Sequence, residues 1–193
     1  RTGTAGQTFT ILDEQNKLVT DASLWLAGHE YQPNKEGAIT VPFSTAPGRQ
    51  PIVIQRGDFA CLDHFNHEGE GYALAAGIYV DREALLTRKK AQVVVRPGLY
   101  LNGTPVTLKL LEEVKLLITS TDLDGVPTSQ DIPNFTLFED RESVHEFNVP
   151  ARLVSISFTL RAKVKNLSAG GQKVDLAASD SFALNEIDKT EKV

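Results

Sequence analysis

The stretch that decides the fold is Leu153–Val164, which reads Leu-Val-Ser-Ile-Ser-Phe-Thr-Leu-Arg-Ala-Lys-Val. Apolar and polar residues alternate along it, and successive side chains of a β-strand point to opposite faces of the sheet. One face would carry Val154, Ile156, Phe158, Leu160, Ala162 and Val164. The alternation therefore predicts a long strand at the centre of a hydrophobic core.

Short runs of β-branched and aromatic residues continue on both sides of this stretch, each closed by Gly, Asn, Asp or Pro. They lie at residues 9–12, 23–27, 38–41, 51–55, 92–95, 104–108, 114–120, 135–138, 144–149 and 173–176. Helix-forming residues gather only in the short segments 81–90 and 108–115. The spacing of the runs is typical of a β-sandwich, so we predict an all-β fold.

The length of 193 residues is compatible with one large β-domain or with two smaller ones. Arg88-Lys89-Lys90 is a basic, solvated run, and Arg96-Pro97-Gly98 interrupts local structure. We therefore predict two β-sandwich modules in series, residues 1–90 and 91–193, the second immunoglobulin-like.

Composition excludes several classes of protein. Hydrophobic residues make up 41% and charged residues 23%, as in folded globular chains. The net charge of -5 provides no basic face, so we predict no nucleic-acid partner. The longest uncharged apolar runs, 72–80 and 91–95, fall far short of the roughly 20 residues of a membrane span. A start at Arg1 in a chain without Met predicts a piece of a larger protein.

The densest group of chemically active side chains lies in residues 58–70. It comprises Asp58, Cys61, Asp63, His64, His67, Glu68 and Glu70. His64 and His67, with Asp63 near, are weak candidates for metal ligands, because imidazoles and carboxylates bind zinc. Their spacing places both rings on one face of a helix but on opposite faces of a strand. Nearby glycines favour a solvated loop, so we predict no metal site.

Cys61 and His64 are the candidates for a thiolate–imidazole pair, because an imidazolium lowers the pKa of a neighbouring thiol. Cys is among the most frequently buried residues, and Phe59 and Leu62 flank Cys61. A packed, inert thiol is the favoured interpretation. We predict no catalytic residue and no cofactor.

Two further patterns have alternative interpretations. Asp122-Leu123-Asp124-Gly125 begins like a calcium loop but lacks the third acidic position and the closing Glu, which favours an Asp-Gly turn.

Trp25 would suit a carbohydrate platform if exposed, but it alternates with Leu24 and Leu26, which favours packing in the core or between modules.

The N-terminal part resembles a known family. Asp13–Val19, Ala22, Leu24, Gly28, Glu36–Pro42 and Ile52–Phe59 follow the pattern of the carboxypeptidase regulatory-like, or prealbumin-like, β-sandwich module over roughly residues 7–60. Asp58 stands between the Gly and the aromatic residue that are usually adjacent in that family. The resemblance implies a small sandwich without catalytic residues.

The next stretch is similar to the strand entry of macroglobulin domains of the α2-macroglobulin-like superfamily. Its residues are Gly77–Leu86 leading into Ala91–Arg96, with Thr87–Lys90 in place of the usual turn. The resemblance implies a large bacterial protein, secreted, periplasmic or attached to the cell envelope. The thioester of that superfamily requires Cys-Gly-Glu-Gln, whereas Cys61 lies in Phe-Ala-Cys-Leu-Asp.

The function that we predict is structural spacing and protein–protein interaction within that larger chain, with its other domains and an unknown protein as partners. Exposed loops and unpaired edge strands would supply the contacts. Two alternatives stay open. One is a carbohydrate-binding β-module, and the other is a metal- or thiol-dependent enzyme centred on residues 58–70.

Overall fold

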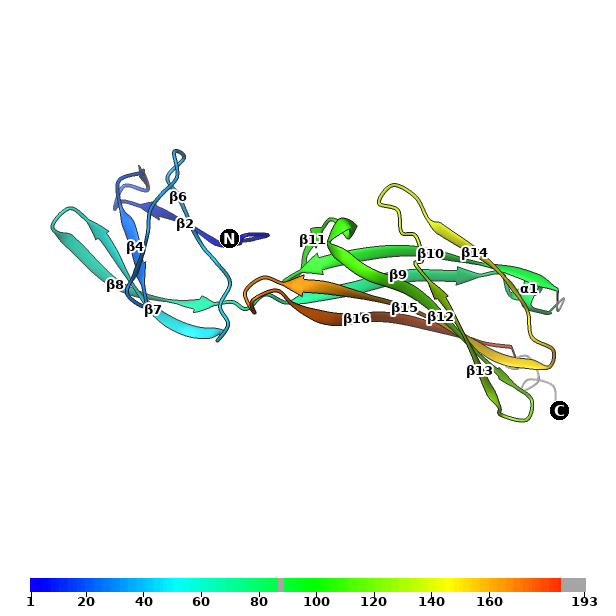
Figure 1. Ribbon diagram of the computed structural model, residues 1–193. Coiled ribbons are helices and arrows are strands. Elements are labelled where there is room, and N and C mark those ends of the chain that lie inside the picture. The colour runs from blue at the N-terminus through cyan, green and yellow to red at the C-terminus, as the bar shows by residue number, and fades with distance from the viewer. Residues whose placement is uncertain (87–88, 185–193) are drawn as a thin grey trace, which may run out of the picture. The chain divides into compact units, whose positions relative to one another are not determined.

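The computed structural model describes residues 1–86 and 89–184 and divides into two compact units (Figure 1). The first comprises residues 1–71 together with the segments 101–104 and 166–172. The second comprises residues 72–100, residues 105–165 and the chain from Lys173 onward. The predicted all-β class is confirmed. The last residues of the predicted second module, 185–193, lie outside the described residues.

The first unit contains two four-stranded sheets. In one, β2 (Gly6–Leu12) pairs with β1 (Thr2–Gly3), β3 (Leu18–Val19) and β6 (Ala38–Val41). The other has the order β5-β4-β7-β8, formed by His29–Tyr31, Ser23–Leu26, Gly48–Arg56 and Phe59–His67. Leu24, Leu26, Ile39, Val41 and Ile52 form a shared core. The two sheets therefore form a small sandwich.

Turns of this unit follow from side-chain chemistry. The Asp13 Oδ1 atom accepts hydrogen bonds from the backbone N–H groups of Gln15 and Lys17, at 2.9 and 2.8 Å. Asn34 closes its own turn in the same way. Asp and Asn favour such turns because their side chains replace backbone acceptors.

The second unit also contains two sheets. In one, β10 (Lys90–Leu101) pairs with β9 (Tyr72–Val80), β11 (Thr104–Val106) and β14 (Ser143–Asn148). The other has the order β13-β12-β15-β16, formed by Pro127–Pro133, Leu111–Asp122, Leu153–Asn166 and Gln172–Ala183. Their facing sides share one core, whose largest fully buried side chains include Phe158, Leu116, Ile156, Leu160, Val93 and Val95. The unit is an immunoglobulin-like sandwich.

The strand β15 has the central place that its alternation predicts, between β12 and β16. Phe158 faces Ile118 across the sheet, and Leu160 faces Leu116. At the start of β15 the prediction was wrong by one residue. A register shift between Thr121 and Asp122 places Leu153 in the core and leaves Val154 only partly buried.

Other elements differ from the predicted pattern. Residues 59–67, 72–80 and 127–133 are strands, whereas residues 135–138 form no strand. Of the two segments rich in helix-forming residues, only Arg82–Leu86 (α1) and the 3₁₀ turn Leu108–Leu110 (η1) are helical among the described residues. Neither described helix has the length and apolar character that a membrane crossing requires.

The boundary between the units lies earlier in the chain than the predicted one near residue 90. The N-terminal segment of the first unit ends at Gly71, and the second unit begins at Tyr72. The reason is that β9 pairs with β10 and therefore belongs to the second sandwich. The run 72–80 had the composition of a strand but no polar alternation to reveal its partner.

Phe158 provides a test of the second core. Its side chain is 0% exposed, so Phe158→Ala should lower the free energy of unfolding by about 3 to 5 kcal/mol through lost burial and a cavity. Phe59→Ala is the matched control, because Phe59 is 70% exposed and its loss should change stability by no more than about 0.5 kcal/mol. Urea unfolding of both variants measures the difference, and equal losses would contradict this core.

Candidate functional site

A β-bulge in β12 shapes the most highly charged surface of the second unit. Glu112 faces Lys163 on β15, and Lys115 faces Arg161, so Glu113 and Val114 together oppose the single residue between those partners. Glu113 has a φ of 53°, in the left-handed region. Bulges of this kind redirect side chains. Here both Glu112 and Glu113 reach lysines of β15 and β16.

These side chains form a ladder of ion pairs across β12, β15 and β16, which we call the charge ladder: Glu112, Glu113, Lys163, Lys165 and Lys173. Glu113 contacts Lys163 at 2.7 Å and Lys173 at 2.6 Å. Glu112 contacts Lys165 and Lys173, each at 2.9 Å. Lys173 therefore joins both carboxylates to the edge strand β16.

The ladder shifts the ionisation of its members. Hydrogen bonds from Lys163 and then Lys173 lower the pKa of Glu113 to about 2. Hydrogen bonds from Lys165 and Lys173 also lower the pKa of Glu112. Hydrogen bonds to Glu113 and Glu112 raise the pKa of Lys173. All of these groups are solvent-exposed, so the stabilisation that each pair contributes is small and sensitive to salt.

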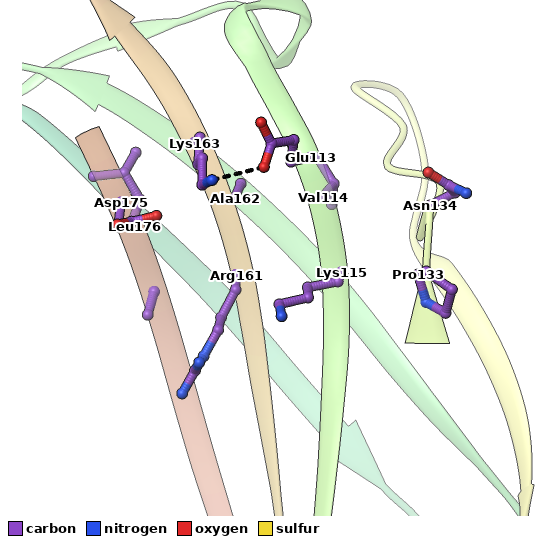
Figure 2. Close-up of a pocket in the computed structure, with 11 residues that line it drawn as sticks. Glu113, Val114, Lys115, Pro133, Asn134, Arg161, Ala162, Lys163, Asp175 and Leu176 are labelled. Carbon is purple, nitrogen blue, oxygen red and sulfur yellow. Dashed lines mark ion pairs between the residues drawn. The ribbon is translucent and has the colours of Figure 1, made fainter. Parts of the chain in front are cut away.

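An open groove of about 600 Å³ lies beside the ladder (Figure 2). Its charged lining comes from Glu113, Lys115, Arg161, Lys163 and Asp175. Figure 2 shows Lys163 and Glu113 joined by their ion pair, with Arg161 farther along the strand of Lys163 and Lys115 farther along the strand of Glu113. Lys115 contacts Asp131 at 3.5 Å, and Arg161 forms no ion pair within the described residues. The groove offers charged contacts, and among the described residues its lining contains no Ser, Thr, Cys or His side chain.

Residues 59–67 correct the predicted loop. They form β8, because Gly57 and Asp58 make a two-residue hairpin between the paired residues Arg56 and Phe59. Gly57 has a φ of 57°, as such tight hairpins require. The Gly-Asp pair was the signal in the sequence that would have predicted this hairpin.

The strand separates the candidate metal ligands. His64 is exposed, whereas His67 is buried and its Nε2 atom lies 2.8 Å from the Pro42 carbonyl oxygen. The Oδ1 atom of Asp63 accepts a hydrogen bond from the backbone N–H of His64. Within residues 1–86 and 89–184, no three His, Cys, Asp or Glu side chains gather in a group that could hold a metal ion.

Cys61 is not the packed thiol that we predicted. It is exposed, and so are its neighbours Phe59 and Leu62, because β8 is an edge strand. Three positions along a strand place Cys61 and His64 on opposite faces. This arrangement does not support a thiolate–imidazole pair.

The remaining candidates have structural roles. Asp122 Oδ1 accepts from the backbone N–H groups of Asp124 and Val126, each at 2.9 Å, which makes the predicted Asp-Gly turn between β12 and β13. Trp25 lies on the face of β4 opposite the buried Leu24 and Leu26 and is half-buried. Its Nε1 atom is buried and has no hydrogen-bond partner among the described residues, so Trp25 is not an open platform for a sugar.

The charge ladder is not evident from the sequence. Lys163 and Lys165 alternate along the strand stretch, which marks them as outward-facing. The adjacent pair Glu112-Glu113 gave no sign that both carboxylates reach the same face, because this depends on the bulge. Lys173 joins the ladder only through the pairing of β15 with β16.

Glu113 makes the stability of the second unit depend on pH. Its pKa falls from the ordinary 4.5 to about 2, so its stabilising contribution is full above pH 4.5 and is lost as pH falls through about 2. Lys173→Met should raise the pKa of Glu113, because one of its two hydrogen-bond donors disappears. Carbon-13 NMR of the Glu113 carboxyl measures this, with Lys35→Met in the first unit as control. An unchanged titration in Lys173→Met would contradict the assigned cause.

Substitution of the two histidines should change the free energy of unfolding by different amounts, and neither histidine should bind a metal. His67→Ala removes a buried hydrogen bond and should cost about 1 to 3 kcal/mol of unfolding free energy, whereas His64→Ala should cost less than about 0.5 kcal/mol. Urea unfolding measures both. Metal analysis by mass spectrometry should find no stoichiometric metal in the original chain. Stoichiometric metal that is lost in the double variant would contradict the assignment.

Comparison with known proteins points to one family. The family model of the AbpF third immunoglobulin-like domain matches residues 81–190. Actin-binding protein F of Dictyostelium discoideum is 35% identical over 199 residues, which cover 100% of this chain and 8% of the relative. The chain thus spans only a small part of that relative's length.

A solved structure, that of a tetra-tandem repeat in the extending region of a large adhesion protein, is 15% identical. The match covers 95% of this chain and 43% of the other, with a TM-score of 0.28, a likeness too low to support an argument.

Proposed function

Because the chain belongs to the family of the AbpF third immunoglobulin-like domain, we propose that it is a non-catalytic spacer and protein-interaction segment of a much longer protein. The observation that carries the proposal is the match of the whole chain to 8% of a long relative. A segment of this kind acts by its shape and its surface.

The distribution of chemical groups supports this function. The charges on the outer face of β12, β15 and β16 mostly pair with one another, and the groove beside them is open and solvated. On β8, His64 lies on the face opposite to Cys61, Asp63 and His67. A catalytic site would need converging groups with a pocket that excludes water.

The folded cores support the role of a spacer. Each unit buries its own apolar core between two sheets, so each folds around contacts of its own. Residues that a partner could contact remain on the outer faces and on the edge strands. Rigid sandwiches joined in series set the distance between neighbouring parts of a long chain.

An actin contact is the second candidate function, and the name of the relative, actin-binding protein, is the observation that favours it. The predicted macroglobulin type, the prealbumin-like first module, the bacterial origin and the location outside the cytosol stay predictions. Fractionation of cells that produce the full-length parent protein tests the location.

Co-sedimentation with filamentous actin separates the two candidates. If the chain is a spacer, residues 1–193 should stay in the supernatant, because the lysines of the charge ladder are paired with its two carboxylates and not with a filament. The control is a chain with the ladder opened by Glu112→Gln and Glu113→Gln, which frees the three lysines. Saturable pelleting of the unchanged chain would favour the actin contact over the spacer.

A further inference from the structure

The edge strand β9 differs from the other long edge strands of the fold. It pairs with β10, and the described residues provide no second neighbour. Proteins protect such edges with charged residues or prolines, because unpaired backbone groups bind other strands. The other edge strands of six or more residues follow this rule: β13 holds Pro127 and Pro133, β16 holds Lys173 and Asp175, and β14 and β8 hold Glu146 and Asp63. Among the short edge strands, β6 (Ala38–Val41) also lacks both. The strand β9 contains neither charge nor proline.

The edge itself is accessible along residues 73–80. Among the described residues, these positions form no backbone hydrogen bond outside their sheet. Their side chains alternate between a core face and an exposed face, with Ile78 and Val80 buried and Ala73, Ala75, Gly77 and Tyr79 exposed. Tyr79 is 64% exposed. The edge therefore offers free backbone groups on a strand whose own side chains carry no charge.

Next to Ala76, the sequence of β9 has small residues at positions 75 and 77 and aliphatic residues at positions 74 and 78. A two-fold axis through this position, perpendicular to the sheet, pairs residues of two antiparallel copies that lie on the same face. Ala75 then faces Gly77 of the second copy, Leu74 faces Ile78, and Ala73 faces Tyr79. Small residues meet small ones, aliphatic residues meet aliphatic ones, and the exposed ring covers an alanine. No like charges, which would destabilise the pair, oppose each other, so the backbone hydrogen bonds of the two edges can form without repulsion.

From this uncharged, unpaired edge and the compatible pairs about Ala76, we propose that β9 binds β9 of a second copy of the chain, in antiparallel register about Ala76, and joins two second units through one continuous sheet. The proposal deepens the proposed interaction function by naming the partner as the same chain. Cross-strand hydrogen bonds of residues 73–79 and the contact of Tyr79 with Ala73 hold the pair.

A pair of double variants tests both the edge and the register. In Ala75→Lys/Gly77→Lys, Lys faces Lys twice across the two-fold axis. In Ala75→Glu/Gly77→Lys, Glu faces Lys twice. Both positions are exposed, and a Cβ at Gly77 would come no closer than 3.9 Å to Arg96, so the side chains fit. The two variants differ only in the sign of one charge per copy.

Sedimentation velocity of residues 1–193 over a range of concentrations measures the association. We expect the unchanged chain to dimerise, and the Lys/Lys variant to dimerise about tenfold or more weakly, because like charges oppose each other directly. The Glu/Lys variant should recover most of the lost affinity. Ala177→Lys, which places the same charge on the edge strand β16, is the matched control and should dimerise like the unchanged chain.

Circular dichroism and thermal unfolding confirm that each variant is folded. Should a double variant fail to fold, Ala75→Lys alone replaces it and should weaken the dimer in the same direction.

Three results would overturn the proposal. The first is a chain that stays monomeric up to roughly 1 mM, the range of the weakest specific associations. The second is a dimer that resists the Lys/Lys change or dissociates with Ala177→Lys. The third is a Glu/Lys variant that dimerises as weakly as the Lys/Lys variant, a result that would reject the register about Ala76. A monomeric chain that also stays out of actin pellets rejects the β9 pairing and leaves the spacer function intact.

Discussion

The second unit depends on one constraint, the burial of every second side chain of β15 against the opposite sheet. Phe158 is wholly buried and contacts Phe147 edge-on, with ring centroids 5.5 Å apart. Because side chains of a strand alternate, burying Ile156, Phe158 and Leu160 fixes which residues face water. A slip of one residue would place Arg161 and Lys163 in the core, so this single alternation determines the register of the sheet around it.

The outward half of the same strand determines the surface. Arg161 and Lys163 face the groove, and Lys163 with Lys165 anchors the two carboxylates of β12. The bulge at Glu113 is what lets two consecutive acidic residues contribute to one face. Its left-handed φ has an energetic cost for a residue with a side chain, and the ion pairs to Lys163 and Lys173 help to offset it. The ion pairs of Lys173 therefore link β16 to β12, and the carboxylates of Glu112 and Glu113 are engaged in ion pairs.

Much of the fold was predictable, because alternation in Leu153–Val164 and the turn residues at Asp122 act through neighbouring positions. The strands β8 and β9 were not recognised, because the polar residues of β8 concealed its hairpin with β7 and because β9 has no polar alternation. Residues 59–67 show the difference: the polar residues suggested a loop, but the hairpin at Gly57-Asp58 pairs them with β7. The charge ladder could not be predicted from spacing, because it requires a bulge in β12 and the pairing of β15 with β16. Cys61 is exposed for the same reason, as only the sheet order makes β8 an edge.

Edges connect this fold to its function. A sandwich of separate sheets leaves unpaired strands at its margins, and a long chain of such sandwiches carries many of them. Charge and proline keep most edges of these two units from pairing, at no cost to either core. An edge that lacks both, such as β9, stays competent to pair without any change in the fold. Selective protection of edges therefore lets an immunoglobulin-like segment serve as an inert spacer along most of its surface and as a contact at a single strand.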